Sequence, residues 1–233
     1  MSIFPRLLVV CLFLVAACTK NKAVEDSCKE VPLAGRLIHT PGTDKYSFRT
    51  SGGGHIEMEL RHAASYRSIV ISYEDYPNFK IEFWGDTTVN GLNKTAANHE
   101  NLNGKHIKDR LGMRRTVLFP DGAKITLISD GPYGPLQFIS IYDGAESHRI
   151  NPRCNTLISS ATDVALARQL DNEEADGETA GFEITSTGLD YFNLYFEDSP
   201  GSKTGSRVDL GELYRDSPNR VDDYFDDPRL GST

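Results

Sequence analysis

The sequence lacks the short motifs that usually mark a hydrolase or a phosphate-binding site. It contains no G-x-S-x-G nucleophile turn and no H-E-x-x-H metal pair. Its longest glycine run, within Ser51–Gly54, precedes an expected strand and is not followed by a helix or by Lys-Ser/Thr. That context indicates a turn and not a phosphate-binding loop. The sequence also contains no internal repeat and no clear domain boundary.

Positive charge is scarce. Lys and Arg number 25 against 33 Asp and Glu, which gives a formal net charge of −8 at pH 7. Nucleic-acid binding depends on clustered Lys and Arg, so this balance argues against it. Anionic lipid headgroups should also repel the chain, so we expect contact with a membrane through a lipid and not through a basic surface.

The sequence has no apolar run long enough for a membrane-spanning helix. The main apolar run follows the single basic residue Arg6 and extends from Leu7 to Ala17, short of the roughly 18 residues that a span needs. A charge, a short apolar run and small residues in this order are typical of a cleavable export signal. We therefore expect residues 1–17 to be removed and the rest to fold outside the cytoplasm.

The end of this run, Val15-Ala16-Ala17-Cys18, resembles the lipobox of bacterial lipoproteins. The resemblance implies that Cys18 is acylated, with chains such as palmitate, and becomes the first residue of the mature protein. Residues 18–27 are polar and would form a tether. Thr19, where enteric bacteria use Asp for inner-membrane retention, favours the outer membrane without indicating a face. The alternative is an ordinary secretory signal ending at Ala17. The whole chain is similar to uncharacterised envelope lipoproteins of Gram-negative bacteria such as the Bacteroidota.

Cysteine occurs at only four positions. Cys11 leaves with the signal and Cys18 takes the lipid, so Cys28 and Cys154 remain as an even pair in an oxidising compartment. We expect a disulfide between them, with two unrelated thiols as the alternative. The bridge would tie the start of the domain to its middle and contribute roughly 4–5 kcal/mol in the chain-entropy model.

Alternating apolar and polar residues predict a chain made mostly of strands. Residues 55–61 alternate as a half-buried strand does. Turns are expected at Pro77-Asn78, Asp121-Gly122 and Asp143-Gly144. Further strands are expected over 67–73, 79–84, 114–119, 123–129, 136–142, 146–150, 181–186 and 189–197. The pattern predicts a mainly β fold, a single β-sandwich or barrel-like domain over 28–233 with an acidic C-terminal tail.

Two segments depart from this pattern. Residues 86–105 are polar and rich in Asn and Gly, which indicates a long loop of the kind that is often functional or mobile. Near residue 162 the apolar period becomes helical, with Thr162 as the expected N-cap of a short helix over 163–172. Its expected apolar face comprises Val164, Leu166, Ala167 and Leu170.

The acidic segment after this helix is the best metal candidate. Asn172, Glu174 and Asp176 fall at positions 1, 3 and 5 of a 12-residue loop, with Gly177 at position 6 and Glu183 at position 12. An EF-hand loop places oxygen ligands around Ca²⁺ at these positions. Position 1 is Asn instead of Asp, and Glu183 belongs to an expected strand. A solvated acidic loop is therefore the alternative to a Ca²⁺ site.

Other titratable residues form weaker patterns. His99 and His106 flank the long loop, and Glu100 is adjacent, so a composite site is one interpretation; a surface or hydrogen-bonded role for each is the other. Four aspartates near the C-terminus could chelate a cation or perform acid–base chemistry, or simply face solvent. These are Asp222, Asp223, Asp226 and Asp227.

The best binding feature is the aromatic strand 189–197. Its alternation places Tyr191 and Tyr195 on one face, which would form an amphipathic platform for sugar rings or a protein surface. Trp84, at a strand end that leads into the long loop, is a second aromatic contact. The alternative is that both faces of the strand are buried.

These observations lead to one main expectation and two alternatives. We expect a lipid-anchored, non-enzymatic β module that binds a glycan, a peptide or an envelope protein through Trp84, Tyr191 and Tyr195. The first alternative is an envelope hydrolase that uses the acidic residues of 172–183 or of the C-terminus, with or without a divalent cation. The second is a purely structural lipoprotein.

Overall fold

The computed structural model describes residues 28–60, 66–86, 98–108, 113–129, 136–185, 188–205 and 208–209. The expected export signal, the acylated Cys18 and the tether lie outside these ranges. So do the four C-terminal aspartates. The expectations for these segments stay predictions.

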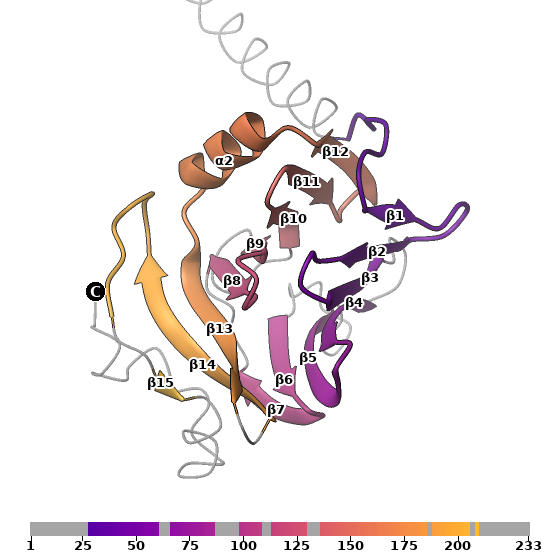
Figure 1. Cartoon of the computed structure of the whole chain (residues 1–233). Coiled ribbons are helices and arrows are strands. Elements are labelled where there is room, and N and C mark those ends of the chain that lie inside the picture. Colours follow the sequence, from indigo (N-terminus) through magenta and orange to yellow (C-terminus); the bar gives the residue numbers. More distant parts are fainter. Residues whose placement is uncertain are drawn as a thin grey trace, which may run out of the picture.

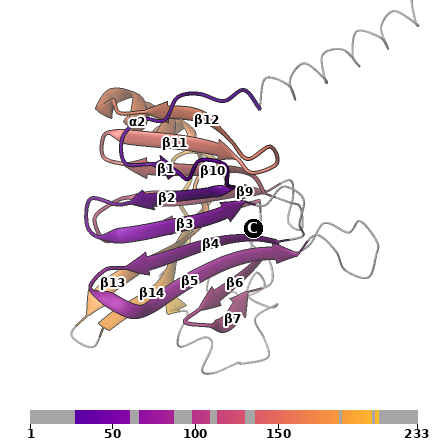
Figure 2. The ribbon, with the colours of Figure 1, turned by 90° about the vertical axis from the view of Figure 1, so that its right-hand side faces the viewer.

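The first sheet is an antiparallel meander in which every strand pairs with the next one along the chain. Figure 2 looks onto this sheet, with β2 to β5 lying one above the other. Its strands are β1 (Ile38–His39), β2 (Lys45–Arg49), β3 (Gly54–Leu60), β4 (Tyr66–Tyr73), β5 (Tyr76–Asp86), β6 (Asn98–Leu102) and β7 (Lys105–Lys108).

The second sheet has the order β12-β11-β10-β9-β8-β13-β14-β15. Its neighbours are antiparallel except β8 and β13, which are parallel. Helix α2 (Val164–Glu173) returns the chain from the edge strand β12 to β13, which lies beside β8. This crossover places α2 against β10 and β11, at the top in Figure 1. Its strands are β8 (Arg114–Leu118), β9 (Lys124–Ser129), β10 (Leu136–Asp143), β11 (Glu146–Asn151), β12 (Thr156–Ala161), β13 (Gly177–Thr185), β14 (Gly188–Glu197) and β15 (Val208–Asp209).

The two sheets pack their apolar faces against each other and share one core. In β3, Ile56, Met58 and Leu60 are fully buried, whereas the intervening residues are exposed or half-buried. The same core cluster contains Ile125 and Ile139 from the second sheet. The expected mainly β fold is confirmed, and of its two forms the structure has the β-sandwich. None of the helices in the described part of the chain has the length and apolar character to cross a membrane.

Two hairpin turns of the second sheet also hold a loop of the first. The turn at Asp121-Gly122 forms as expected, and the hairpin expected at Asp143-Gly144 forms with its turn at Gly144-Ala145, directly after the last residue of β10. The Asp121 carboxylate accepts hydrogen bonds from Thr50 Oγ1 (2.7 Å) and from the Gly52 N–H. The Asp143 carboxylate accepts from the Ser51 N–H (2.7 Å) and Oγ (2.9 Å). The β2–β3 turn, which includes the expected Ser51–Gly54 turn, is therefore clamped to the opposite sheet.

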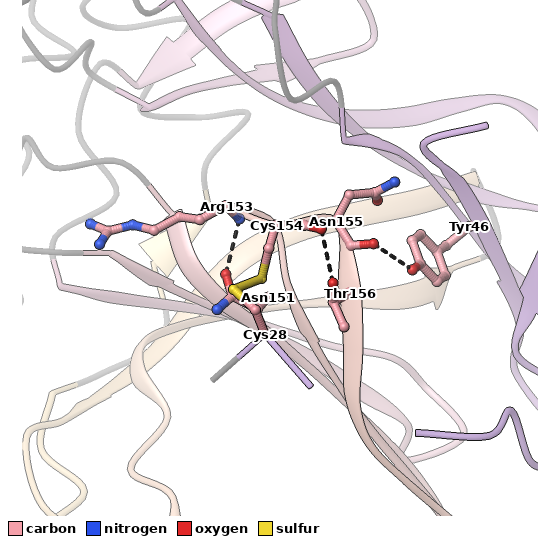
Figure 3. Close-up of a disulfide and its surroundings, with 7 residues drawn as sticks. All are labelled: Cys28, Tyr46, Asn151, Arg153, Cys154, Asn155 and Thr156. Atoms are coloured by element: carbon pink, nitrogen blue, oxygen red, sulfur yellow. Dashed lines mark hydrogen bonds between the residues drawn. A yellow bond between two sulfur atoms is a disulfide. The ribbon is translucent and has the colours of Figure 1, made fainter. Parts of the chain in front are cut away.

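A disulfide joins Cys28 to Cys154, as expected, with 5.9 Å between the Cα atoms and a sequence separation of 126. Figure 3 shows it at the turn between β11 and β12, beside Asn151 and Thr156. The Val31 N–H donates to the Leu157 carbonyl at 2.9 Å, so the segment after Cys28 continues alongside β12. The point at which the chain enters the sandwich is thereby fixed at this turn.

Two expected boundaries in the first sheet are wrong. Pro77 and Asn78 lie inside β5, and the turn is at Glu74-Asp75 instead. The two residues occupy a register shift between the pairs Ser72–Lys80 and Tyr73–Tyr76, where a proline that lacks an N–H is tolerated. The expected loop 86–105 also contains a hairpin, because β6 and β7 are joined at Asn103-Gly104.

The helix forms, but its cap and its apolar face differ from expectation. Asp163, and not Thr162, is the N-cap, since its carboxylate accepts from the Leu166 N–H at 2.7 Å. Ala167 is buried, whereas Val164 and Leu166 are 48% and 41% exposed. The helix is short and reaches the sheet mainly through its middle, so the side chains of its first turn extend past the core.

Candidate functional site

The three residues expected to contact a ligand do not share a face. Trp84 is half-buried on the outer side of the first sheet, opposite the buried neighbour Phe83. Tyr191 points into the sandwich and is 2% exposed. Tyr195 lies on the outer side of the second sheet, where its hydroxyl donates to Asp176 at 2.7 Å. The expected tyrosine platform is therefore wrong, and for Tyr191 the burial alternative is confirmed.

A β-bulge separates the two tyrosines. Along β14, Asn193 pairs with Ala180 but Tyr195 pairs with Thr179, so the strand advances two residues while its partner advances one. A bulge of this kind reverses the alternation of side chains beyond it. Tyr191 consequently faces the core and Tyr195 faces away from it.

Tyr191 belongs to a buried polar network centred on Arg115 of β8. The guanidinium donates to both carboxylate oxygens of Glu100 on β6, at 2.8 and 3.0 Å. It also donates to Asn193 at 2.8 Å and to Glu178 at 3.2 Å, and the Tyr191 hydroxyl donates to Glu100 at 2.6 Å. Arg115 is 1% exposed and Glu100 is 0% exposed. The network therefore links the two sheets through a desolvated, bidentate ion pair.

The electrostatics of this network keep Arg115 charged. Burial alone would lower the pKa of Arg115, but the facing Glu100 and Glu178 carboxylates and the Tyr191 hydroxyl raise it well above its ordinary value. Burial raises the pKa of Tyr191 well above its ordinary value, so its hydroxyl remains a donor. A buried charge pair with these additional hydrogen bonds fixes the geometry of the groups that it joins. Removing one partner strongly lowers the stability of the fold. The network holds β6 in one register against the second sheet.

Because Glu100 points inward, its neighbour His99 points outward beside Trp84. The rings of Trp84 and His99 stack with centroids 4.1 Å apart and planes inclined by 24°. The His99 and His106 centroids are 5.6 Å apart. His106 Nδ1 lies 3.3 Å from Asn101 Oδ1 on the paired strand. The Trp84–His99–His106 row thus crosses β5, β6 and β7 on the outer face of the first sheet.

Of the three residues considered for a composite site around the long loop, the structure groups two. The structure brings His99 and His106 together, because β6 and β7 form a hairpin. Glu100 is adjacent in sequence only, since it faces the opposite side of the sheet.

The expected calcium loop does not form. Helix α2 includes Asn172 and ends at Glu173, and Gly177 to Glu183 lie in the extended strand β13. A strand rises about 3.3 Å per residue, so Glu183 lies roughly 20 Å beyond Gly177 and cannot close a loop. Across the described ranges, no three His, Cys, Asp or Glu side chains gather to hold a metal ion.

The other acidic residues of this segment have structural partners. Asp176 is 4% exposed and binds Lys124, which also binds Asp171 beneath the end of α2. Ser140 Oγ donates to Glu174 at 3.0 Å, and burial raises the pKa of Glu174. Glu183, in β13, is exposed. Of the carboxylates that a hydrolase could use, Glu174 and Asp176 thus hold the helix-to-strand connection against the outer face of the second sheet.

The structure also contains a hydrogen-bonded Ser–His–Glu chain that the sequence analysis missed. His148 Nδ1 lies 3.0 Å from Ser160 Oγ, and His148 Nε2 lies 3.1 Å from Glu146. This chain depends on the pairing of β11 with β12, which sets His148 opposite Ser160. That pairing was the only signal from which the chain could have been predicted. The His148 side chain is fully buried, and Ser160 and Glu146 accept from the N–H groups of Ala34 and Arg36. The chain therefore fastens the N-terminal segment to the edge of the sandwich.

Of the arrangements described, the Trp84–His99–His106 row is the candidate site. The side chains of Arg115 and His148 are buried, whereas the row is half-buried on an outer face. It also contains Trp84, one of the two expected contact residues that lie on an outer face. Comparison with known proteins gives no match to any family model, curated protein or solved structure.

Proposed function

We propose that the protein is a bacterial envelope lipoprotein whose β-sandwich binds a glycan, a peptide or another envelope protein through the Trp84–His99–His106 row. The observation that carries this proposal is the position of the only tryptophan in the chain. It stacks on an imidazole outside the core, whereas five aromatic residues of β2 to β5 are buried inside it. These are Tyr46, Phe48, Tyr73, Phe79 and Phe83.

A half-buried tryptophan on an outer sheet face suits recognition of a partner. Trp combines a large apolar surface with an N–H donor, and it is enriched at the centres of binding interfaces. The row is also preorganised, because the Arg115–Glu100 pair anchors β6 from beneath and the hairpin fixes β7 beside it. A rigid surface loses little conformational entropy on binding, which favours affinity.

The anchoring part of the proposal rests on the signal pattern and gains support from the disulfide. A Cys28–Cys154 bridge is typical of an oxidising compartment outside the cytoplasm. Ten residues, 18–27, would connect the lipid to the fixed point at Cys28 and could span at most about 36 Å. The sandwich would therefore remain close to the membrane surface.

The anchor is tested by the mass and location of the protein from bacterial cells. We expect the mature chain to begin at Cys18 with acyl chains attached and to sediment with membranes. Cys18→Ala should abolish acylation and release the protein from membranes, whereas Cys11→Ala, within the expected signal, should leave both unchanged. A mature chain that begins elsewhere or has no lipid mass would overturn the anchoring proposal.

The binding site is tested by capture with the acylated protein in detergent. The probes are a panel of envelope glycans and a solubilised envelope extract analysed by crosslinking. For any ligand found, Trp84→Ala should weaken binding at least tenfold while changing the melting temperature little. Tyr195→Phe, on the outer face of the other sheet, is the matched control and should bind normally. Equal binding by wild type and Trp84→Ala would exclude the row as the binding surface.

A further inference from the structure

The two imidazoles of the row have the separation of a metal-binding pair. Zn²⁺ and similar ions bind imidazole nitrogens at about 2.0–2.1 Å, so two rings that share one tetrahedral ion have centroids roughly 5 Å apart. The His99 and His106 centroids are 5.6 Å apart, with planes inclined by 60°. The centroid separation of the two rings is therefore close to that of a pair that shares one ion.

The surroundings of His106 match those of a histidine ligand. A metal-binding imidazole generally hydrogen-bonds through its other ring nitrogen to an oxygen acceptor, which fixes its tautomer and orientation. His106 Nδ1 lies 3.3 Å from the Asn101 side-chain oxygen on the paired strand. With the proton on Nδ1, Nε2 is the nitrogen that coordinates.

The backbone beneath the pair is rigid. β6 and β7 are joined by the two-residue turn Asn103-Gly104, in which both residues have positive φ (52° and 76°) as the tight hairpin requires. Glu100, next to His99, is fixed by the buried Arg115. A rigid two-strand support keeps the two imidazoles close before an ion arrives, which lowers the entropic cost of binding.

We propose that His99 and His106 form a two-histidine site for a divalent transition-metal ion, with Cu²⁺ bound most tightly of the common ions. Imidazole suits Zn²⁺, Ni²⁺ and Cu²⁺, and affinity in such sites rises to a maximum at Cu²⁺. Within the described segments no third His, Cys, Asp or Glu joins the pair. His99 and His106 thus supply two of the coordination positions of the ion. The site requires neither the lipid anchor nor an organic ligand.

The only tryptophan reports directly on this site. Trp84 stacks on His99 with ring centroids 4.1 Å apart. Paramagnetic Cu²⁺ quenches indole fluorescence at such short range, whereas diamagnetic Zn²⁺ does so weakly. Titrating the purified mature protein with Cu²⁺ alone, in a buffer that does not chelate it, should give saturable quenching at one ion per chain. EDTA should reverse the quenching, and added Zn²⁺ should shift the Cu²⁺ midpoint upward.

Matched histidine variants decide the assignment. His99→Gln and His106→Gln should each weaken Cu²⁺ binding at least tenfold, measured by fluorescence and independently by calorimetry, with unchanged melting temperatures in the absence of metal. His55→Gln removes a half-buried imidazole from β3 on the same sheet face and should bind Cu²⁺ like wild type. Quenching that does not saturate would overturn the proposal. So would binding that survives both substitutions, or that falls equally in His55→Gln.

Discussion

Adjacent residues of β6 lie in opposite environments. His99 faces outward into a row of half-buried rings, whereas Glu100 faces inward and is fully paired with Arg115. Strand alternation separates the two environments by a single residue. The inner residue can therefore determine stability and register, while the outer residue belongs to the row proposed for recognition. If this is correct, substitutions on the two faces of β6 should affect different measurements.

The largest expected effect is on the inner side. Arg115→Met should reduce the free energy of unfolding by about 3–5 kcal/mol, because it leaves the Glu100 and Glu178 carboxylates buried without their cation. Urea unfolding monitored by circular dichroism measures this loss.

Arg49→Met is the matched control for this substitution. It breaks an ion pair with Glu74 in which both side chains are more than half exposed, and such pairs contribute about 0–1 kcal/mol. If Arg115→Met were no more destabilising than Arg49→Met, the inner network would not hold the sheets together.

A smaller effect is expected from a single inner hydroxyl. Tyr191→Phe removes the donor to Glu100 and should cost about 1–3 kcal/mol, since a buried group then loses a hydrogen bond. Tyr195→Phe, whose hydroxyl is only partly buried, should cost less. Equal losses for the two variants, again from urea unfolding, would contradict the distinction between inner and outer tyrosines.

The smallest expected effect is on the pH dependence of the unfolding free energy, through His148, the inward-facing histidine of β11. Burial lowers the pKa of His148 below its ordinary value near 6.5, against the opposing attraction of Glu146. The unfolded chain then binds a proton more readily than the folded one. The stability from His148 is therefore complete above pH about 6.5 and is lost as the pH falls towards the lowered pKa. Unfolding free energies measured between pH 7.5 and 5 should show this decline.

His148→Gln should flatten the decline in that range. The difference between wild type and variant isolates this group from the carboxylates, whose ordinary pKa values lie lower. Glu146 contributes a loss of stability only below pH about 4.5. Hydrogen bonds from Arg36 and His148 lower the pKa of its carboxyl group despite burial. An unchanged slope in His148→Gln would show that His148 is not the group responsible.

Local patterns in the sequence predicted most of the strands. The alternation of 55–61 and the Asp-Gly turns were sufficient for β3 and for the hairpins of the second sheet, because those signals lie within a few residues. The disulfide followed from the small number of cysteines and the expected compartment. None of these inferences required knowledge of a contact between distant segments.

The candidate site depended on distant contacts and was predicted only in part. The bulge that turns Tyr195 away from Tyr191 is set by pairing with β13 and is not visible in the alternation of β14. The sequence pattern did not predict β6, because its inward-facing residue is the charged Glu100. Arg115 neutralises this charge across the core. The Asn103-Gly104 pair was the one local signal for the β6–β7 hairpin.

The central claim is that a partner covers the Trp84–His99–His106 row in the cell envelope. Hydroxyl-radical labelling of the protein in isolated envelopes and after purification, read by mass spectrometry, tests it most directly. The account predicts several-fold slower oxidation of Trp84 in envelopes, with equal oxidation of Met113, which is 62% exposed just before β8. Equal oxidation of Trp84 in both samples would contradict it.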